Sequence, residues 1–398
     1  MNTLPNPPGD LATIPDGLQP FIHENTWISY SPGRINLIGE FTDYNNGFVL
    51  PAAIDKGVYF AITPRDDHRI CLYSNDFREE YFTSTDHPER SIKSSWPNYI
   101  LGVVNQFQQA GITLNGFDAA ITGNMPIGSG LSSSAAVECS VALILNEISK
   151  SGFEKLQLVV MAQKAENDFV GVKCGIMDQF ASMFGIPNQA IKIDCRSLEY
   201  EYLPLNMNGL RIVLLNSNVK HSHGTSEYNV RRQQCERGVA MIQQHEPAIE
   251  SLRDATPAML DKYILPHDSI IYKRCKFILG ENERVLNAAE NLKLGDVKAF
   301  GQKMFASHDG IKNLYEASCP EIDFLVEGVK ENPSVLGARM MGGGFGGCSI
   351  NLVKEEAVED LFKQSTAAYR KSMNMELTAH VVSIEAGSTI LKQPQARA

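Results

Sequence analysis

The run PGRINLIGEFTDYNNG, residues 32–47, gathers side chains that could do chemistry. Its one basic residue is Arg34, and two carboxylates, Glu40 and Asp43, follow on either side of Phe41. A guanidinium group can pair with a carboxylate or a phosphate, and carboxylates accept hydrogen bonds from hydroxyl groups. The run is therefore a candidate site for a polar or charged ligand.

A glycine- and serine-rich run, NMPIGSGLSSSAAVE at residues 124–138, is a second candidate. We expect a strand to end before it, two glycines to allow close approach of the backbone, and three serines to open a helix: Gly128, Gly130, Ser132, Ser133 and Ser134. Free backbone N–H groups and the helix dipole favour an anion there, and serine hydroxyls can bind Mg²⁺. A helix capped by serine after a flexible turn explains the same residues equally well. The run is not a P-loop, because no lysine follows its last glycine.

A third run, AENDFVGVKCGIMDQF at residues 165–180, contains two more carboxylates of interest. Glu166 lies in a helical pattern, and Asp178 follows Gly175 at the start of another. An aspartate at such a position is usually a helix cap. It becomes a catalytic candidate only if it meets Arg34, whose guanidinium group would hold the carboxylate ionised and in position.

The run GARMMGGGFGG, residues 337–347, contains the spacing GxGxxG at Gly342, Gly344 and Gly347. Dinucleotide binding by this pattern requires a strand before it and a helix after it. Here the strand pattern CSINLV follows, so the sequence excludes that function. The glycines still predict a backbone that lies very close to another strand or to a ligand.

Periodicity predicts the elements that must position these runs. In the first half we expect strands over 27–31, 48–54, 57–62, 117–123 and 189–195, and helices over 132–149, 155–169 and 176–184. In the second half we expect a buried strand over 210–218, several helices up to about residue 331, strands over 348–353 and 380–384, and a helix from residue 355. Mixed strands and helices of this kind predict an α+β fold.

The length of 398 residues is too great for one compact core and predicts two domains. We place an N-terminal arm at residues 1–24 and domains at 25–200 and 201–398. The formal charge of −10 argues against nucleic-acid binding, which normally needs a basic surface. The one basic pair, Arg231 and Arg232, is expected on the solvated face of a helix.

The eight cysteines show neither CxxC spacing nor a zinc-binding pattern with histidines, which predicts reduced and mostly buried thiols. The proline-rich N-terminus lacks the apolar stretch of a signal peptide. No window approaches the roughly 20 apolar residues that a membrane helix needs. We therefore expect a soluble cytoplasmic protein, with no membrane or nucleic-acid partner, that acts as a monomer.

In this order and spacing the runs resemble the motifs of the GHMP small-molecule kinases, and among them the galactokinase family. Residues 32–47 resemble the galactokinase signature, PIGSGLSSSA resembles the GHMP ATP loop, and MGGGFGG resembles the third family motif. The similarity continues through GIMDQF and through residues 216–235 and 307–323, so it covers nearly the whole chain from about residue 25. It implies two α+β domains with the active site in the cleft between them.

The resemblance also implies an activity: transfer of a phosphoryl group from ATP, with Mg²⁺, to the C1 hydroxyl of galactose in galactose catabolism. Asp178 would be the catalytic carboxylate, with Arg34 beside it. The sugar would contact Glu40, Phe41, Asp43, Gly175 and Tyr228. Mg²⁺ would be held by Ser134 and Glu166. The ATP contacts would be Gly128, Ser129, Gly130, Leu131, Ser132, Ser133 and Ser134, with Trp96 near the adenine.

One position departs from the family, which usually reads GEHTDYN where this chain reads GEFTDYN. Phe41 cannot make the hydrogen bond that a histidine would make with the sugar, unless it packs in the core and a neighbour makes that bond instead. A kinase for another sugar, such as N-acetylgalactosamine or arabinose, therefore remains an alternative. A non-catalytic galactose or ATP sensor is another, although such a protein should lose part of the ATP loop or the catalytic carboxylate, and both are present here.

Overall fold

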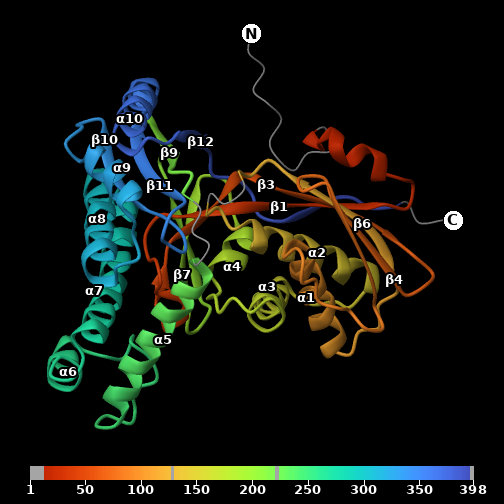
Figure 1. The fold of residues 1–398 in the computed structure, drawn as a ribbon, viewed down its shortest axis with the longest axis horizontal. Helices are drawn as coiled ribbons and strands as arrows, with labels where there is room; N and C mark the ends of the chain where they lie inside the picture. The colour runs from red at the N-terminus through yellow and green to blue at the C-terminus, as the bar shows by residue number, and fades with distance from the viewer. Residues whose placement is uncertain (1–12, 127–129, 220–223, 395–398) are drawn as a thin grey trace.

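The computed structural model describes residues 13–126, 130–219 and 224–394. Two layered parts lie side by side, the first half of the chain on the right of Figure 1 and most of the second half on the left. Each part combines helices with a largely antiparallel sheet. The expected α+β fold is confirmed.

A six-stranded sheet is the frame of the first part, with the strand order β13-β1-β3-β6-β4-β5. Among the strands that the structure describes in this sheet, only β4 and β6 pair in parallel. The strands are β1 (Trp27–Asn36), β3 (Pro51–Pro64), β4 (Arg69–Ser74), β5 (Glu79–Ser84), β6 (Phe117–Gly123) and β13 (Thr389–Lys392). A bulge between Pro32 and Arg34 interrupts the pairing of β1 with β3, just where the first candidate run begins.

Four helices cover one face of this sheet (Figure 1): α1 (Trp96–Gln109), α2 (Ser133–Ser149), α3 (Lys155–Lys164) and α4 (Met177–Phe184). The central one, α2, is buried at every position from Ala135 to Leu145. A helix that is buried all round must be apolar all round, and this one is, apart from Glu138 and Ser140. Because α2 packs against β1 and β3, its N-terminus lies beside the end of β1 that carries Arg34.

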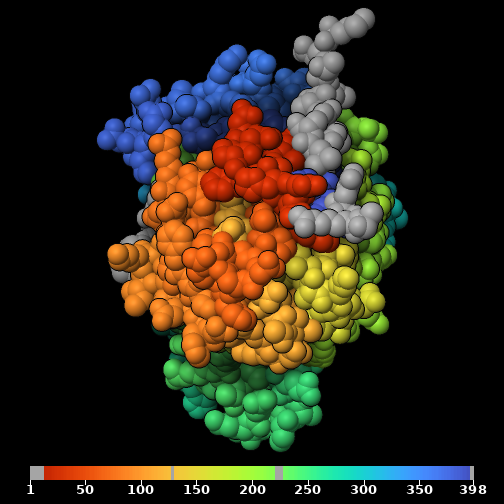
Figure 2. All heavy atoms as spheres, turned by 90° about the vertical axis from the view of Figure 1, so that its right-hand side faces the viewer, coloured from red at the N-terminus to blue at the C-terminus, as the bar shows by residue number. Residues whose placement is uncertain are grey.

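The opposite face of the sheet carries a 3₁₀ helix, η2 (Asp16–Phe21), whose Leu18 is buried in a small cluster with Tyr30 and Tyr59. In Figure 2 this red segment lies on the outer surface, between the orange strands of the first half and the blue C-terminal part. The region expected to be an irregular arm therefore includes a helical segment, while residues 1–12 lie outside the described part of the chain.

The second part is built on a four-stranded sheet of order β10-β11-β9-β12. Its strands are β9 (Leu210–Asn216), β10 (Val335–Met340), β11 (Cys348–Lys354) and β12 (Thr378–Val382). The helices around it are α5 (Gly224–Gln243), α6 (Pro257–Tyr263), α7 (Ser269–Lys293), α8 (Val297–Gly310), α9 (Pro320–Lys330) and α10 (Val358–Met373). Both α8 and α9 pack on β10.

Short elements complete the fold and join its parts. A three-stranded sheet consists of β2 (Phe48–Val49), β7 (Gln189–Asp194) and β8 (Tyr200–Pro204). The remaining turns are the 3₁₀ helices η3 (Asp43–Asn45) and η6 (Glu355–Ala357) and the π-helical turns η4 (Ala165–Val170) and η5 (Ile311–Tyr315). No helix in the described ranges has the length and the apolar content that crossing a membrane requires.

The expected strands β6, β7 and β9 and the expected helices α2 and α4 are confirmed within one or two residues. Two expectations were wrong in detail: residues 51–64 form one strand rather than parts of two, and the helix from Lys155 turns into a π-helix after Lys164. The strand β10, which includes the first residues of the run at 337–347, was not predicted. The predicted domain division near residue 200 stays a prediction, and β13 lies beyond it in sequence but pairs with β1.

Candidate active site

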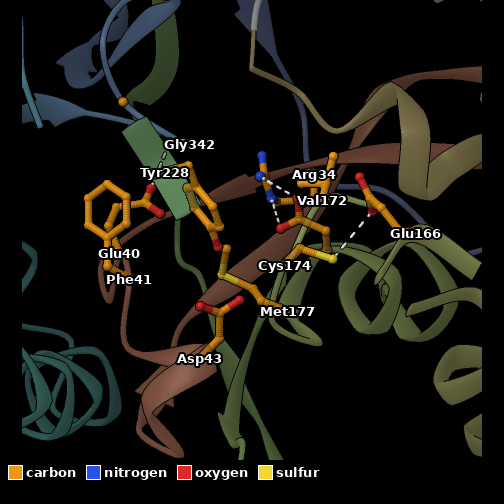
Figure 3. A pocket seen from close by; sticks show the side chains of 13 residues that line it. Arg34, Glu40, Phe41, Asp43, Glu166, Val172, Cys174, Met177, Tyr228 and Gly342 are labelled. Carbon is orange, nitrogen blue, oxygen red and sulfur yellow. Dashed lines mark hydrogen bonds and ion pairs between the residues drawn. The ribbon is translucent and has the colours of Figure 1, made fainter. Parts of the chain in front are cut away.

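A cavity of about 220 Å³ lies where the two parts meet (Figure 3). Nine of its lining residues come from the first half: Arg34, Glu40, Phe41, Asp43, Glu166, Val172, Cys174, Met177 and Asp178. The second half adds Tyr228 and three glycines of the run at residues 337–347. The cavity therefore combines residues from all the candidate runs except the glycine- and serine-rich one, which borders it.

Arg34 and Asp178 form a bidentate ion pair. Arg34 Nε donates to Asp178 Oδ1 at 2.7 Å and Nη2 donates to Oδ2 at 2.8 Å, while Nη1 donates to the carbonyl of Gly130 at 2.8 Å. The side chain of Arg34 is 4% exposed, whereas that of Asp178, in the first turn of α4, is 23% exposed. The condition that made Asp178 a catalytic candidate is therefore met.

Ser132 completes the setting of Asp178. Its backbone is left-handed, with φ at 59°, and its hydroxyl donates to Asp178 Oδ2. That side chain makes no capping hydrogen bond to α2. Capping by this serine, the simpler explanation of the run, is therefore wrong, and the N-terminus of α2 keeps the partial positive charge that attracts an anion.

Glu166 lies in the π-helical turn η4, a kind of irregularity that is frequent at functional sites. Burial, together with the charge of Asp178, raises the pKa of Glu166 to about 7, and hydrogen bonds with Cys174, Ser134 and Gln179 act against this shift. Gln179 Nε2 donates to Glu166 Oε2 at 2.8 Å and to Glu138 Oε2 at 2.9 Å. Burial raises the pKa of Glu138 well above its ordinary value.

The hydroxyl of Ser134 and the carboxylate of Glu166 fit Mg²⁺ as hard oxygen donors. Mg²⁺ in kinases is usually bound by one or two protein oxygens together with phosphate oxygens and water. Within the described residues no group of three or more histidine, cysteine or acidic side chains could hold a metal by itself. The donors present therefore suit a metal that arrives with a nucleotide.

Asp43 begins the short helix η3 and faces the same cavity. Burial and the charge of Asp178 raise its pKa to about 7. Gly175 packs directly against this carboxylate, and a Cβ atom at Gly175 would overlap it. Gly175 was predicted to contact the sugar, but it is not among the residues that line the cavity and lies behind the carboxylate of Asp43.

Phe41 is 3% exposed and packs into the core of the second part. Its ring stacks on Tyr315, with the centroids 4.6 Å apart, and also contacts Phe277 and Tyr228. Its backbone is left-handed, with φ at 66°, a conformation that costs a bulky residue about 1–2 kcal/mol. The aromatic packing compensates for this cost, and the ring forms an apolar wall of the cavity.

Tyr228 projects from α5 into the cavity, next to Glu40 and Phe41 in Figure 3. Burial raises its pKa well above the ordinary value, so the hydroxyl keeps its proton and can donate a hydrogen bond. The neighbouring Arg231 was expected on a solvated face, and this was wrong. It is 8% exposed and donates to the carbonyls of Tyr315 and Glu316.

A second cavity, of about 250 Å³, lies on the other side of the N-terminus of α2. Trp96, Ser133 and Ser134 line it, as do Tyr99 and Phe77. Ser134 therefore lines this cavity and also interacts with Glu166, which lines the first one. Ser134 thus lies between the two cavities.

The other predicted nucleotide contacts divide into two groups. Gly130 and Leu131 line neither cavity, and their carbonyls accept hydrogen bonds from Arg34. Gly128 and Ser129 lie outside the described residues.

Sequence reasoning missed several residues of this site. Gln179, Cys174, Met177 and Arg339 all lie within runs that the motifs drew attention to, but nothing in their local pattern distinguishes them. Their position is decided by contacts with distant segments, for example by the bonds from Gln179 to both Glu138 and Glu166.

Comparison with known proteins agrees with this geometry. Family models described as the GHMP kinases N terminal domain, the galactokinase galactose-binding signature and the GHMP kinases C terminal match residues 98–186, 19–64 and 288–371. The galactokinase of Thermotoga neapolitana is 42% identical over 353 residues, which cover 88% of this chain and 96% of that protein. The galactokinase of Bacillus subtilis is 39% identical over 371 residues, which cover 91% and 94%.

Among solved structures, Lactococcus lactis galactokinase complexed with galactose has a TM-score of 0.87 and 36% identity, covering 92% of this chain and 95% of that one. The mevalonate kinase of Methanococcus jannaschii, with a TM-score of 0.58, 19% identity and 90% and 98% coverage, shares the fold. Three matched family models and similarity over most of both chains lead to one conclusion: this chain belongs to the galactokinase family of the GHMP kinases.

Proposed function

We propose that this protein transfers the γ-phosphoryl group of MgATP to the C1 hydroxyl of galactose, giving galactose 1-phosphate and ADP. The observation that carries the proposal is the ion pair of Arg34 with Asp178, which lies between a cavity of suitable size for a sugar and the N-terminus of α2. The names of the relatives support galactose as the acceptor.

In this mechanism Asp178 accepts a hydrogen bond from the C1 hydroxyl and takes its proton as the new bond from oxygen to phosphorus forms. The bond from the γ-phosphorus to the bridging oxygen breaks, and its electron pair stays with ADP. Phosphoryl transfer through a loose transition state needs mainly positioning and charge stabilisation. Arg34 supplies positive charge beside the attacking oxygen, and Ser132 helps to keep Asp178 in place.

Ser134 and Glu166 are the proposed Mg²⁺ ligands. When bound, the metal neutralises charge on the β- and γ-phosphates. Ser134 is suited to this role because it lies between the two cavities, where a nucleotide in one would meet a sugar in the other. Trp96 and Tyr99 provide flat apolar surfaces for the adenine in the second cavity.

The sugar hydroxyls are proposed to bind Glu40, Asp43 and Tyr228, which face the first cavity. Phe41 gives that cavity one apolar wall. Because of this wall, a different sugar is a second candidate substrate. One chain lines both cavities, so a monomer is sufficient for the proposed activity. All eight cysteines, which lie within the described residues, are free thiols, as suits a reducing cytoplasmic compartment.

The test is release of ADP, measured with a coupled assay, against a panel of galactose, N-acetylgalactosamine, arabinose, glucose and 2-deoxygalactose. We expect the highest kcat/KM with galactose. A higher value with another sugar would assign the protein to that substrate. No sugar-dependent ADP release, with galactose binding intact, would favour the sensor.

A further inference from the structure

Arg339, at the end of β10, is completely buried although it is charged. Its Nε donates to the carbonyl of Leu37 at 2.8 Å, its Nη1 donates to the carbonyl of Met340 at 2.7 Å, and its Nη2 donates to the carbonyl of Asn36. Nη2 also lies 3.0 Å from Glu40 Oε1, with which it forms an ion pair. Arg339, 299 positions after Glu40 in the chain, therefore binds the backbone and one carboxylate of the galactokinase signature.

The same carboxylate oxygen has a second donor in the glycine-rich run. The backbone N–H of Gly342 donates to Glu40 Oε1 at 2.8 Å, an interaction drawn in Figure 3. Gly342 has a left-handed backbone, with φ at 88°, so a side chain there would be strained. At Gly342 the glycine-rich run lies close to the backbone of Gly130, and this position brings its N–H to Glu40.

These contacts give the two carboxylate oxygens of Glu40 different surroundings. Oε1 accepts from Arg339 and from Gly342, whereas no described residue donates a hydrogen bond to Oε2. Glu40 nevertheless lines the cavity, where it lies beside Tyr228 and across from Arg34 in Figure 3. A carboxylate fixed at one oxygen presents its other oxygen in a single orientation.

We propose that Arg339 is a positioning residue for the sugar: it orients Glu40 so that Oε2 accepts a hydrogen bond from a hydroxyl of galactose. This inference rests on the proposed function, since it requires a sugar in the first cavity. Arg339 itself lines neither cavity, so it acts only through Glu40 and the backbone of residues 36–37.

Arginine suits this role better than lysine. Its planar group offers five donors in a fixed geometry, and here four acceptors surround it. Lysine would keep the charge but could not reach all four acceptors at once. Removing the charge would leave the buried Glu40 with only one donor at Oε1, and a buried carboxylate without its partner reorients or takes up a proton.

A purely structural role is the competing explanation, because Arg339 joins the two parts of the protein. The two roles differ in what a substitution changes. A structural residue affects the melting temperature and the active fraction, but not the KM of the molecules that remain folded. A positioning residue raises the KM for the sugar, and it does so only while Glu40 is present to be positioned.

The experiment compares Arg339→Met, Arg339→Lys, Glu40→Gln and the double variant Arg339→Met/Glu40→Gln with the parent. Arg274→Met is the matched control. Arg274 is also buried, at 3% exposed, and it donates to the carbonyl of Leu314 and to the carboxylate of Glu316. Neither partner lines the cavity. KM and kcat for galactose, KM for ATP, galactose affinity by calorimetry and melting temperature are measured for each.

We expect Arg339→Met to raise the KM for galactose about 10-fold or more, with the KM for ATP within about 2-fold of the parent value. The KM of Arg339→Lys for galactose should lie between those of the parent and Arg339→Met. Arg339→Lys serves as the test if Arg339→Met does not fold. In the Glu40→Gln background, Arg339→Met should change the galactose affinity by less than about 2-fold, because the two substitutions remove one interaction. Arg274→Met should lower the melting temperature without changing either KM.

Three results would overturn the inference. The first is a lower melting temperature in Arg339→Met and Arg339→Lys with an unchanged KM for galactose, as in the control. The second is an effect of Arg339→Met that is equally large with and without Glu40→Gln. The third is an unchanged KM in Glu40→Gln itself, which would remove Glu40 from the sugar site. Failure of the proposed function has a different signature, since the parent would then release no ADP with galactose.

Discussion

Arg34 and Asp178, 144 residues apart in the chain, face each other with both nitrogens of one edge of the guanidinium group against both carboxylate oxygens, at 2.7 and 2.8 Å. Such bidentate pairs are strong and geometrically specific. With Ser132 also bound to Oδ2, the carboxylate has its position before any substrate arrives. Preorganisation of this kind is a large part of what an enzyme contributes to phosphoryl transfer.

Asp178→Asn should therefore remove turnover and spare nucleotide binding. A positioned base contributes about 10²–10⁴-fold, so kcat should fall by at least that lower factor. Calorimetry with MgADP measures nucleotide affinity separately from kcat. Asp168→Asn is a suitable control, because Asp168 lies nearby in η4 but its carboxylate is 62% exposed. More than about a tenth of the parent kcat in Asp178→Asn would contradict the role of base.

Ser134→Ala and Glu166→Gln should each raise the Mg²⁺ concentration needed for half-maximal activity, since each removes one proposed oxygen ligand. Binding of Mn²⁺ in the presence of ADP, followed by electron paramagnetic resonance, gives a readout that does not depend on catalysis. Glu147→Gln, at an exposed position on α2, controls for loss of charge. If neither substitution changes metal dependence or Mn²⁺ affinity, the metal is held elsewhere.

Phe41→His tests whether this chain lacks a hydrogen bond to the sugar. A restored bond of about 0.5–1.5 kcal/mol would lower the KM for galactose roughly 2- to 13-fold, with a smaller change in kcat. The melting temperature should fall, because the stacking of Phe41 on Tyr315 is lost. Phe41→Leu, which restores no bond, is the control. An unchanged or higher KM in the histidine variant would mean that the pocket is organised around the aromatic ring.

Asp43 should make both stability and sugar binding depend on pH. Its pKa rises from an ordinary 3.8 to about 7 in the folded protein, through burial and then through the charge of Asp178. Over that interval the unfolded state loses the proton while the folded state keeps it, so the free energy of unfolding should decrease as pH rises from 3.8 to about 7. Galactose binding should strengthen over the upper part of the interval, because an ionised carboxylate accepts hydrogen bonds from hydroxyl groups more strongly than a protonated one.

Urea unfolding and galactose calorimetry between about pH 5 and pH 8 measure both effects, and Asp43→Asn isolates them from Glu166, whose pKa is also raised to about 7. The asparagine variant should be more stable than the parent above pH 7 and should bind galactose more weakly. Equal pH dependence in parent and variant would show that another group is responsible.

Local sequence signals were sufficient wherever an element depends on its own residues. The helix over 133–149 and the strands over 117–123 and 189–194 follow from apolar periodicity, with serine at the start of the helix and Gly123 at the end of the first strand. The residue types of the candidate runs predicted a site for a polar or anionic ligand, and the kinase activity was implied by their resemblance to the motifs of the galactokinase family. Such motifs can be compared without a fold because they combine particular side chains in short, fixed spacings.

Tertiary structure alone decided which of these residues meet. From the residues alone the pairing of Arg34 with Asp178 was only a condition, although the family resemblance implied it, and the pairing of Arg339 with Glu40 was not foreseen at all. Burial of Arg231, stacking of Phe41 on Tyr315 and the return of β13 to β1 were also invisible in the sequence. The physical reason is that these partners lie on different layers of the fold. Periodicity specifies which face of an element is buried, whereas the packing of complete layers determines which buried groups come within hydrogen-bonding distance.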